Sequence, residues 1–191
     1  MVPSEPSKVI GLLGGTFNPA HAGHLHISQY ALEMLPIDAL WWLVSYDHPV
    51  KAPAGLMPFA ERMAHAAALL KPYRAITVSD FEQQAGTRYT IDTLLALEAC
   101  HPNDRFIWLM GADNLTTFHN WHRWDEILNH VPIVVFNRGN EKIQALTSPF
   151  AVQFSAAHVA SPQQLSLTAP YNWCFLDIPT HPASSTELRE K

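Results

Sequence analysis

Residues 14–27 read Gly-Gly-Thr-Phe-Asn-Pro-Ala-His-Ala-Gly-His-Leu-His-Ile, directly after an apolar run at residues 9–13. This order predicts a buried strand, a tight glycine turn and the start of a helix. Gly14 and Gly15 carry no Cβ, so the backbone can turn sharply there and a bulky anion can approach the main chain closely. Helical spacing of apolar residues begins after Pro19, and the amides at a helix N-terminus favour negative charge. The stretch therefore predicts a phosphate-binding turn at the end of a strand.

Two histidines, His21 and His24, stand three residues apart in the first turn of this expected helix. Side chains at this spacing project from neighbouring positions, so both imidazoles would meet a phosphate bound at the helix N-terminus. The alternative is a strand-to-helix turn that uses glycine for its geometry, with both histidines hydrogen-bonded locally. We favour the phosphate site because the glycines and the histidines occur together at the end of a strand.

The composition is that of one globular domain: 191 residues, 48% hydrophobic and 15% charged, with a formal net charge of -5. The acidic balance argues against a general nucleic-acid-binding or membrane-surface protein. We expect a flexible N-terminus over residues 1–8 and a single domain over residues 9–191. Because no apolar leader and no run of about 20 apolar residues occurs, we expect a cytoplasmic protein. Cys100 and Cys174 lack C-x-x-C spacing, so we expect two buried thiols rather than zinc ligands or a disulfide.

Short apolar runs alternate with helical patterns, which predicts a doubly wound parallel α/β sheet with a Rossmann-like arrangement. The expected strands are residues 9–13, 39–44, 76–78, 105–110, 131–136 and 173–178. The expected helices are residues 23–35, residues 58–70, and a third helix that ends at Cys100 with Thr90 as its N-cap. Helical spacing over residues 121–128 indicates core packing, Trp124 included. The pattern weakens over residues 140–171, where we expect a short helix at 150–159 and a loop at 161–170.

The C-terminal run Ser184-Ser185-Thr186-Glu187-Leu188-Arg189 allows two interpretations. Ser184 and Glu187 fit a capping box, which would mark another helix N-terminus without any ligand. Alternatively, the hydroxyls of Ser185 and Thr186, the first-turn amides and Arg189 would form a second anion clamp. The two interpretations are compatible with each other.

Known nucleotide-binding motifs narrow the function. The chain has neither the G-x-G-x-x-G of a dinucleotide fold nor the G-x-x-x-x-G-K-[ST] of a P-loop. Instead, the glycine pair followed by His21-Ala22-Gly23-His24 resembles the T/H-x-G-H nucleotidyltransferase superfamily, and Gly-Gly-Thr-Phe-Asn-Pro resembles the bacterial nicotinate-nucleotide adenylyltransferases. Many of these carry Asp where this chain has Asn18. Further segments that resemble the family are Arg88-Tyr89-Thr90-x-x-Thr93-Leu94, Gly111-Ala112-Asp113-Asn114-Leu115, Phe118-x-x-Trp121 and the run from Ser184 to Arg189.

The resemblance implies roles for particular residues of this chain. Its catalytic residues would be His21, His24 and Arg189. Its ATP-binding residues would further include Gly14, Gly15, Thr16, Phe17, Asp113, Ser184, Ser185 and Thr186. Near a mononucleotide it would place Thr90, Ile91, Trp121 and Arg138, although Trp121 fits core packing as well as stacking on the pyridine ring. No metal ligand is expected among the side chains, and Mg²⁺ would be held mainly by ATP phosphates and water.

The implied reaction is adenylyl transfer from ATP to nicotinate mononucleotide. The mononucleotide phosphate is already an anionic nucleophile, so alignment and charge neutralisation would suffice without a general base. Main-chain donors at residues 89–91 would favour the nicotinate carboxylate over the nicotinamide amide. Two rivals stay open: transfer to another small phosphate, such as pantetheine phosphate or a cytidylyl acceptor, and a regulator that binds nucleotide without catalysis. The sequence allows a homo-oligomer without indicating one.

Overall fold

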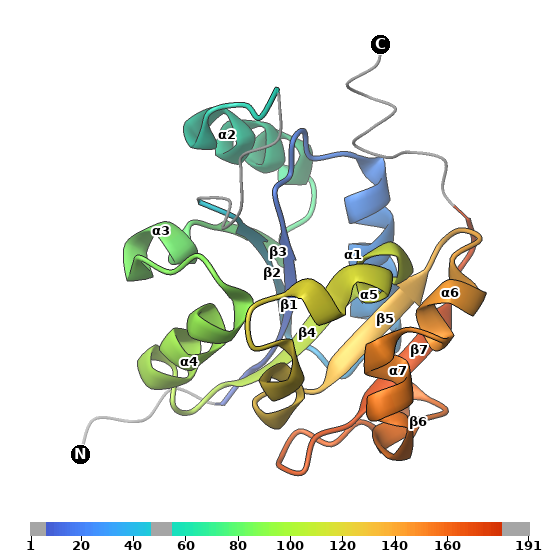
Figure 1. Ribbon diagram of the computed structural model, residues 1–191. Coiled ribbons are helices and arrows are strands. Elements are labelled where there is room, and N and C mark those ends of the chain that lie inside the picture. The colour runs from blue at the N-terminus through green and yellow to red at the C-terminus, as the bar shows by residue number, and fades with distance from the viewer. Residues whose placement is uncertain (1–6, 47–54, 181–191) are drawn as a thin grey trace.

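A computed structural model describes residues 7–46 and 55–180 and shows a parallel sheet covered by helices on both faces (Figure 1). The strands are β1 Val9–Gly15, β2 Ala39–Val44, β3 Ile76–Ser79, β4 Arg105–Gly111, β5 Ile133–Asn137, β6 His158–Val159 and β7 Trp173–Asp177. Their order is β3-β2-β1-β4-β5-β7-β6, and every neighbouring pair is parallel. The predicted doubly wound α/β fold is therefore confirmed.

The helices fill the connections between these strands. They are α1 Ala22–Met34, α2 Phe59–Leu70, α3 Phe81–Ala85, α4 Thr90–Cys100, α5 Ala112–Thr117, α6 Lys142–Leu146 and α7 Pro149–Gln153, with 3-10 helices η1 Phe118–Asn120, η2 Trp124–Asn129, η3 Ser155–Ala157 and η4 Pro162–Gln164. Among the described residues, every helix falls short of the length and apolar character needed to cross a membrane.

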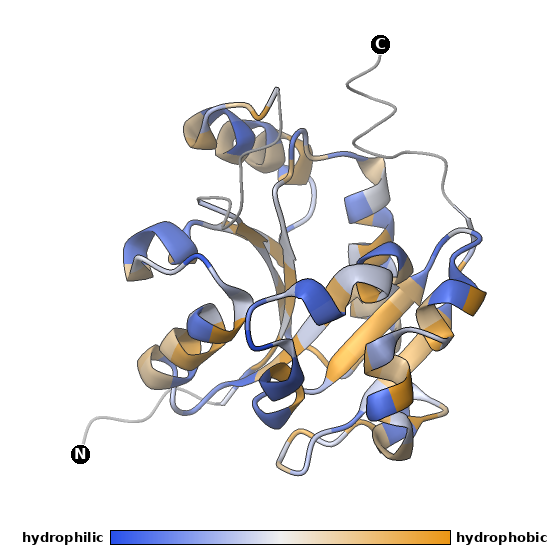
Figure 2. Cartoon of the chain, viewed as in Figure 1, coloured by the Kyte–Doolittle hydropathy of each residue, from blue (hydrophilic) through white to orange (hydrophobic). Residues whose placement is uncertain are grey.

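Alternation along the strands divides the core into two layers, because successive side chains of a strand point to opposite faces. In β4, Phe106 and Trp108 belong to the layer that packs against α4, α5 and α7. Their neighbours Ile107 and Leu109 belong to the layer that packs against α1 and α2. Both faces are thus buried, as in other parallel sheets, and Figure 2 shows β5 in the orange of hydrophobic residues.

Several local expectations were wrong. Tyr89, not Thr90, is the N-cap of α4, and Thr90 is its first helical residue. The core packing expected over residues 121–128 is confirmed, since Ile127 and Leu128 are buried and Trp124 packs against the same core, although the segment is the end of η1 followed by η2. The helix expected at residues 150–159 is the short α7 followed by η3 and β6.

The two cysteines differ in their surroundings. Cys174 is buried in β7, and burial raises the pKa of its thiol to about 12. Cys100 is exposed at the end of α4, so the prediction that both thiols are buried was wrong for this residue. The single-domain boundaries stay a prediction, since the described residues do not reach the C-terminus. Lys8, the last residue of the expected N-terminal segment, is bound to the domain, because its main-chain N–H donates to Asp104 Oδ1 at 3.0 Å.

Candidate functional site

The switch point of the sheet lies between β1 and β4, where the strand order reverses. In an open α/β sheet, ligands bind outside the carboxyl ends of the strands at this position. The glycine pair ends β1, Gly111 ends β4, and Arg138 directly follows β5. Three strand ends, each from a stretch singled out in the sequence, are therefore neighbours at one edge of the sheet.

Gly14 is required by packing as well as by the turn. A Cβ at this position would lie 2.4 Å from Cη2 of Trp108, whose indole is 2% exposed. Phe17, two residues after the pair, has a φ of 47° and is 1% exposed. Its ring stacks on Trp42 with centroids 4.9 Å apart and lies 4.6 Å from the ring of His24. The turn is thus built on buried aromatic rings.

The two histidines are held by the first turn of α1. His21 is the N-cap, and its Nδ1 accepts the main-chain N–H of Gly23 at 3.0 Å. The Nδ1 of His24 accepts the main-chain N–H of His21 at 3.2 Å, and the ring centroids are 3.9 Å apart. With Nδ1 accepting in both rings, the hydrogen-bond pattern assigns the proton of each neutral imidazole to Nε2. These local hydrogen bonds, the alternative to a phosphate site, engage Nδ1 of each ring.

The ring of His24 is uncharged near neutral pH. Burial is the largest cause that lowers its pKa to about 3, and the electrostatic effects of His21 and Arg138 act in the same direction. His24 is therefore a neutral hydrogen-bond donor through Nε2 rather than a cation. The residue following β5, Arg138, therefore lies close enough to act electrostatically on His24.

The end of β4 presents an acidic side chain. Asp113 lies in the first turn of α5 and is exposed. A Cβ on Gly111 would lie 2.3 Å from its Oδ1, so the absence of a side chain at Gly111 lets this carboxylate fold back over the strand end. Among the described residues, no three His, Cys, Asp or Glu side chains gather as a metal site.

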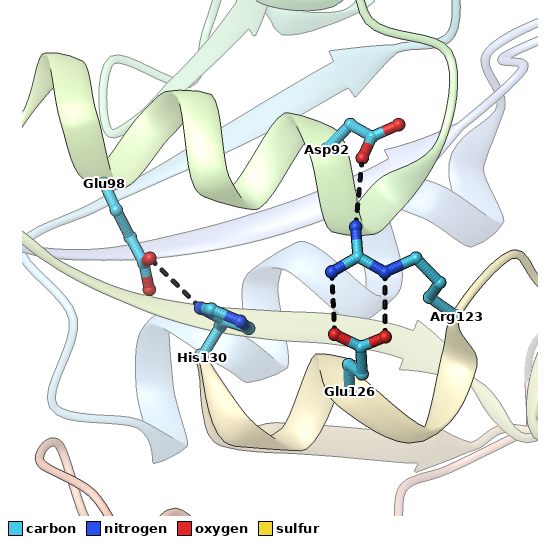
Figure 3. A network of polar contacts seen from close by, with 5 residues as sticks. All are labelled: Asp92, Glu98, Arg123, Glu126 and His130. Atoms are coloured by element: carbon cyan, nitrogen blue, oxygen red, sulfur yellow. Dashed lines mark hydrogen bonds and ion pairs between the residues drawn. The ribbon is translucent and has the colours of Figure 1, made fainter.

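Of the residues expected around the mononucleotide, Thr90 and Ile91 lie on α4, Trp121 follows η1, and Arg138 follows β5. An ion pair joins α4 to the segment after η1, because Arg123 Nη1 lies 3.6 Å from Asp92 of α4 while the same guanidinium binds Glu126 (Figure 3). The rings of Tyr89 and His122 are 4.4 Å apart at the same place. The first turn of α4, which carries Thr90 and Ile91, therefore lies beside the segment that follows Trp121.

Trp108 links the two halves of the candidate site. Its indole meets the ring of Trp121 edge-on, with centroids 6.3 Å apart, and the same indole covers Gly14. Trp121 is half-buried and also contacts Phe118. The side chain of Ile91 is fully buried in the core, so only its main chain is available to a ligand.

The proposed second clamp lies outside the part of the chain that the structure describes. This holds for Ser184, Ser185, Thr186 and Arg189, whose assignment to ATP and whose capping-box alternative both stay predictions. The other residues assigned from the sequence are described.

Two polar residues near the glycine turn had no assigned role in the sequence. Asn18 is 3% exposed, and its side-chain amide donates to the carbonyl of Gly55 at 3.1 Å while its Oδ1 accepts Met57 N–H at 3.0 Å. An aspartate could accept but not donate in this pair of contacts. Arg62 is 2% exposed on α2. Arg62, Ala66 and Leu70 follow one another at intervals of four residues, and this helical spacing is the sequence signal that places Arg62 on the buried face.

Comparisons with known proteins cover nearly the whole chain. Residues 12–191 match the family described as Cytidylyltransferase-like. A protein of Cereibacter sphaeroides named "Probable nicotinate-nucleotide adenylyltransferase" is 45% identical over 95% of this chain and 96% of its own length. A protein of the same name from Parvibaculum lavamentivorans is 44% identical over 97% of this chain and 93% of its own length.

A solved structure shares the fold at much lower identity. It is the Plasmodium falciparum nicotinic acid mononucleotide adenylyltransferase complexed with NaAD, with a TM-score of 0.72 and 18% identity. The match covers 96% of this chain and 83% of that one. At this identity the likeness supports the fold and no individual site residue.

Proposed function

The chain belongs to the cytidylyltransferase-like family and, within it, to the nicotinate-nucleotide adenylyltransferases; we propose that it transfers the adenylyl group of ATP to nicotinate mononucleotide. The products are nicotinate adenine dinucleotide and pyrophosphate, in a step of NAD biosynthesis. The observation that carries this conclusion is 45% identity over 95% of the chain to a relative of that name.

The reaction needs no side-chain nucleophile. An oxygen of the mononucleotide phosphate attacks the α-phosphorus of ATP, a new P–O bond forms, and the bond from the α-phosphorus to the oxygen bridging to the β-phosphate breaks as pyrophosphate leaves. Both reacting groups are anions, so the protein must align them and offer hydrogen-bond donors to the oxygens that carry the charge.

His21 and His24 are the donors that we assign to the α-phosphate. Their Nδ1 atoms are engaged by main-chain N–H groups, so their Nε2–H groups are the ones that can meet phosphate oxygens. A neutral donor fixed by its own helix turn needs no rearrangement as charge develops, which favours the transition state. The amides at the N-terminus of α1 add to this effect.

Further ATP contacts are proposed from Gly14, Gly15, Thr16, Phe17 and Asp113, and from Ser184, Ser185, Thr186 and Arg189 beyond the described residues. Nicotinate mononucleotide would contact the first turn of α4 at Thr90 and the main chain of Ile91, together with Trp121 and Arg138. The proximity of α4 to the segment after Trp121 supports this placement.

Mg²⁺ is the proposed cofactor. The donor set fits a metal that keeps its water, because Asp113 offers one exposed carboxylate beside the strand ends and the phosphates of ATP would supply further oxygens. When bound, the metal would neutralise charge on the departing pyrophosphate. ATP as co-substrate also supports a cytoplasmic location, and the oligomeric state is left open.

One assay tests the function. The purified chain is incubated with ATP and Mg²⁺ and with nicotinate mononucleotide, nicotinamide mononucleotide or pantetheine phosphate, and pyrophosphate release and the dinucleotide product are measured. We expect nicotinate mononucleotide to be used with kcat/KM at least about tenfold above its nicotinamide analogue, since an amide would leave a buried donor unpaired. ATP binding without pyrophosphate release would favour the regulator, and pyrophosphate release only with pantetheine phosphate would change the acceptor.

A further inference from the structure

A buried arginine ties the glycine turn to two other segments. From α2, Arg62 Nη1 donates to the carbonyl of Thr16 at 2.7 Å and to the carbonyl of Ser45 at 2.8 Å. Its Nε donates to the carbonyl of Met57 at 3.1 Å, and its Nη2 to the carbonyl of Tyr46 at 3.5 Å. One guanidinium therefore joins the turn after β1, the end of β2 and the segment before α2.

The carbonyl of Thr16 belongs to the peptide group that leads into Phe17. Phe17 has a φ of 47°, in the left-handed region that residues with a Cβ rarely adopt. Such a conformation persists only where the surroundings hold it. Arg62 holds the peptide group before Phe17. Asn18, the residue after Phe17, is held by the hydrogen bonds of its side-chain amide with Gly55 and Met57. The conformation of the turn thus depends on contacts from both sides.

The burial of Arg62 needs an explanation beyond filling space, because a buried charge is costly unless it is paired. Glu82 of α3 is 7% exposed and interacts electrostatically with Arg62, and its Oε2 accepts the N–H of Tyr46 at 3.3 Å. A well-packed apolar side chain would often serve stability as well as such a pair. What an apolar side chain lacks is the planar set of donors that meets carbonyls from several segments at once.

We propose that Arg62 is a positioning residue for ATP, which acts by holding the main chain of the Thr16-Phe17 turn in its nucleotide-binding form. The proposal rests on the proposed function, in which this turn contacts ATP. Arg62 itself is 2% exposed, so we expect it to touch neither substrate. These four hydrogen bonds go to the turn after β1, the end of β2 and the segment before α2, and none of their acceptors lies in the first turn of α4, which is assigned to the mononucleotide. Loss of Arg62 should therefore affect the use of ATP and spare the mononucleotide.

The test compares Arg62→Met and Arg62→Lys with Leu70→Ala, which removes a buried side chain at the other end of α2. We expect Arg62→Met to raise the KM for ATP about tenfold or more and to leave the KM for the mononucleotide within about twofold, because displacing a binding element affects the ligand it positions. Arg62→Lys should lie between wild type and Arg62→Met, since lysine keeps the charge and loses the fork. Leu70→Ala should lower the melting temperature and leave both KM values within about twofold.

Two results would overturn the proposal: an Arg62→Met protein whose two KM values rise equally, and one whose kinetics match those of Leu70→Ala. If Arg62→Met does not fold, Arg62→Lys decides, and an unchanged KM for ATP in that variant counts against the proposal. Calorimetric binding of a non-hydrolysable ATP analogue separates this test from the proposed function. A wild-type chain that binds the analogue but transfers no adenylyl group would refute the function, while the ratio of dissociation constants between wild type and Arg62→Lys would still decide the role of Arg62.

Discussion

The main-chain N–H of His21 donates to Nδ1 of His24 at 3.2 Å, so the first residue of the H-x-G-H motif orients the ring of the last. The N–H of Gly23 does the same for the ring of His21. The motif is thus a helix cap in which each imidazole uses one nitrogen for the cap and directs Nε2–H as a donor. Because Nδ1 serves the helix cap and Nε2–H serves as the donor, substitutions can remove one role of each histidine and keep the other.

His24→Gln and His24→Asn separate the donor from the cap. A glutamine amide reaches the position of Nε2, whereas an asparagine side chain ends near the position of Nδ1. We expect His24→Asn to lose about a hundredfold or more in kcat, as when an oxyanion donor is removed, and His24→Gln to retain about ten times the activity of the asparagine variant. Steady-state kinetics at saturating substrates measure this. Equal losses would mean that a hydrogen bond from Nε2 is not what His24 contributes.

His21→Asn and His21→Ala separate the cap from catalysis at the N-terminus of α1. Asparagine is a good N-cap, so His21→Asn should change the free energy of unfolding little, whereas His21→Ala should cost about 1 kcal/mol. Both variants should lose kcat to a similar extent, because neither has a donor at the position of Nε2. Urea denaturation and turnover are measured on the same preparations. If His21→Asn turns over at the wild-type rate, His21 serves only as a cap.

The pH dependence of stability should carry a contribution from Glu82. Burial raises the pKa of this carboxyl from 4.5 to about 7, so between these values the folded state keeps a proton that the unfolded state has released. The free energy of unfolding therefore falls as pH rises through this window, by up to about 3 kcal/mol, and the loss is complete above it. His24, whose pKa is lowered, gives the opposite slope below about pH 6.5.

Glu82→Gln isolates that contribution, because the slope from His24 cancels in the difference between variant and wild type. We expect the stability of Glu82→Gln relative to wild type to increase from about pH 5 to about pH 8. Urea denaturation across this range gives the difference directly. A difference independent of pH would show that Glu82 has the same pKa in the folded and unfolded chains.

Gly14→Ala tests the contact with Trp108. The added Cβ would lie 2.4 Å and 2.8 Å from two carbons of the indole, so we expect destabilisation by about 1 to 3 kcal/mol. In a Trp108→Leu background the same substitution should cost less, because the ring that it would meet is gone. A double-mutant cycle by urea denaturation measures this coupling. Additive effects would mean that the turn avoids the ring by moving.

Much of the fold was predictable because its signals are local. The strand expected at residues 39–44 is β2 at the same limits, since a strand buried on both faces is a continuous apolar run. The helix after the glycine pair begins at Ala22, one residue before the expected start. Boundaries failed where several short helices follow one another, as over residues 140–171, because each is held by packing rather than by its own periodicity.

The candidate site likewise has a part that local sequence signals predict and a part that depends on tertiary packing. Gly14, Gly15, His21 and His24 could be assigned from the sequence because the elements that place them are adjacent along the chain, and local backbone geometry suffices to bring them together. The connection of Trp108 with Gly14 and the contacts of Arg62 with Thr16 and Ser45 join residues distant in sequence. Such contacts arise only when the strands align side by side and their ends meet. The amino-acid order therefore specified the glycine turn and the histidine cap, whereas tertiary packing decided what supports them, because burial and hydrogen-bond partners exist only after the sheet has formed.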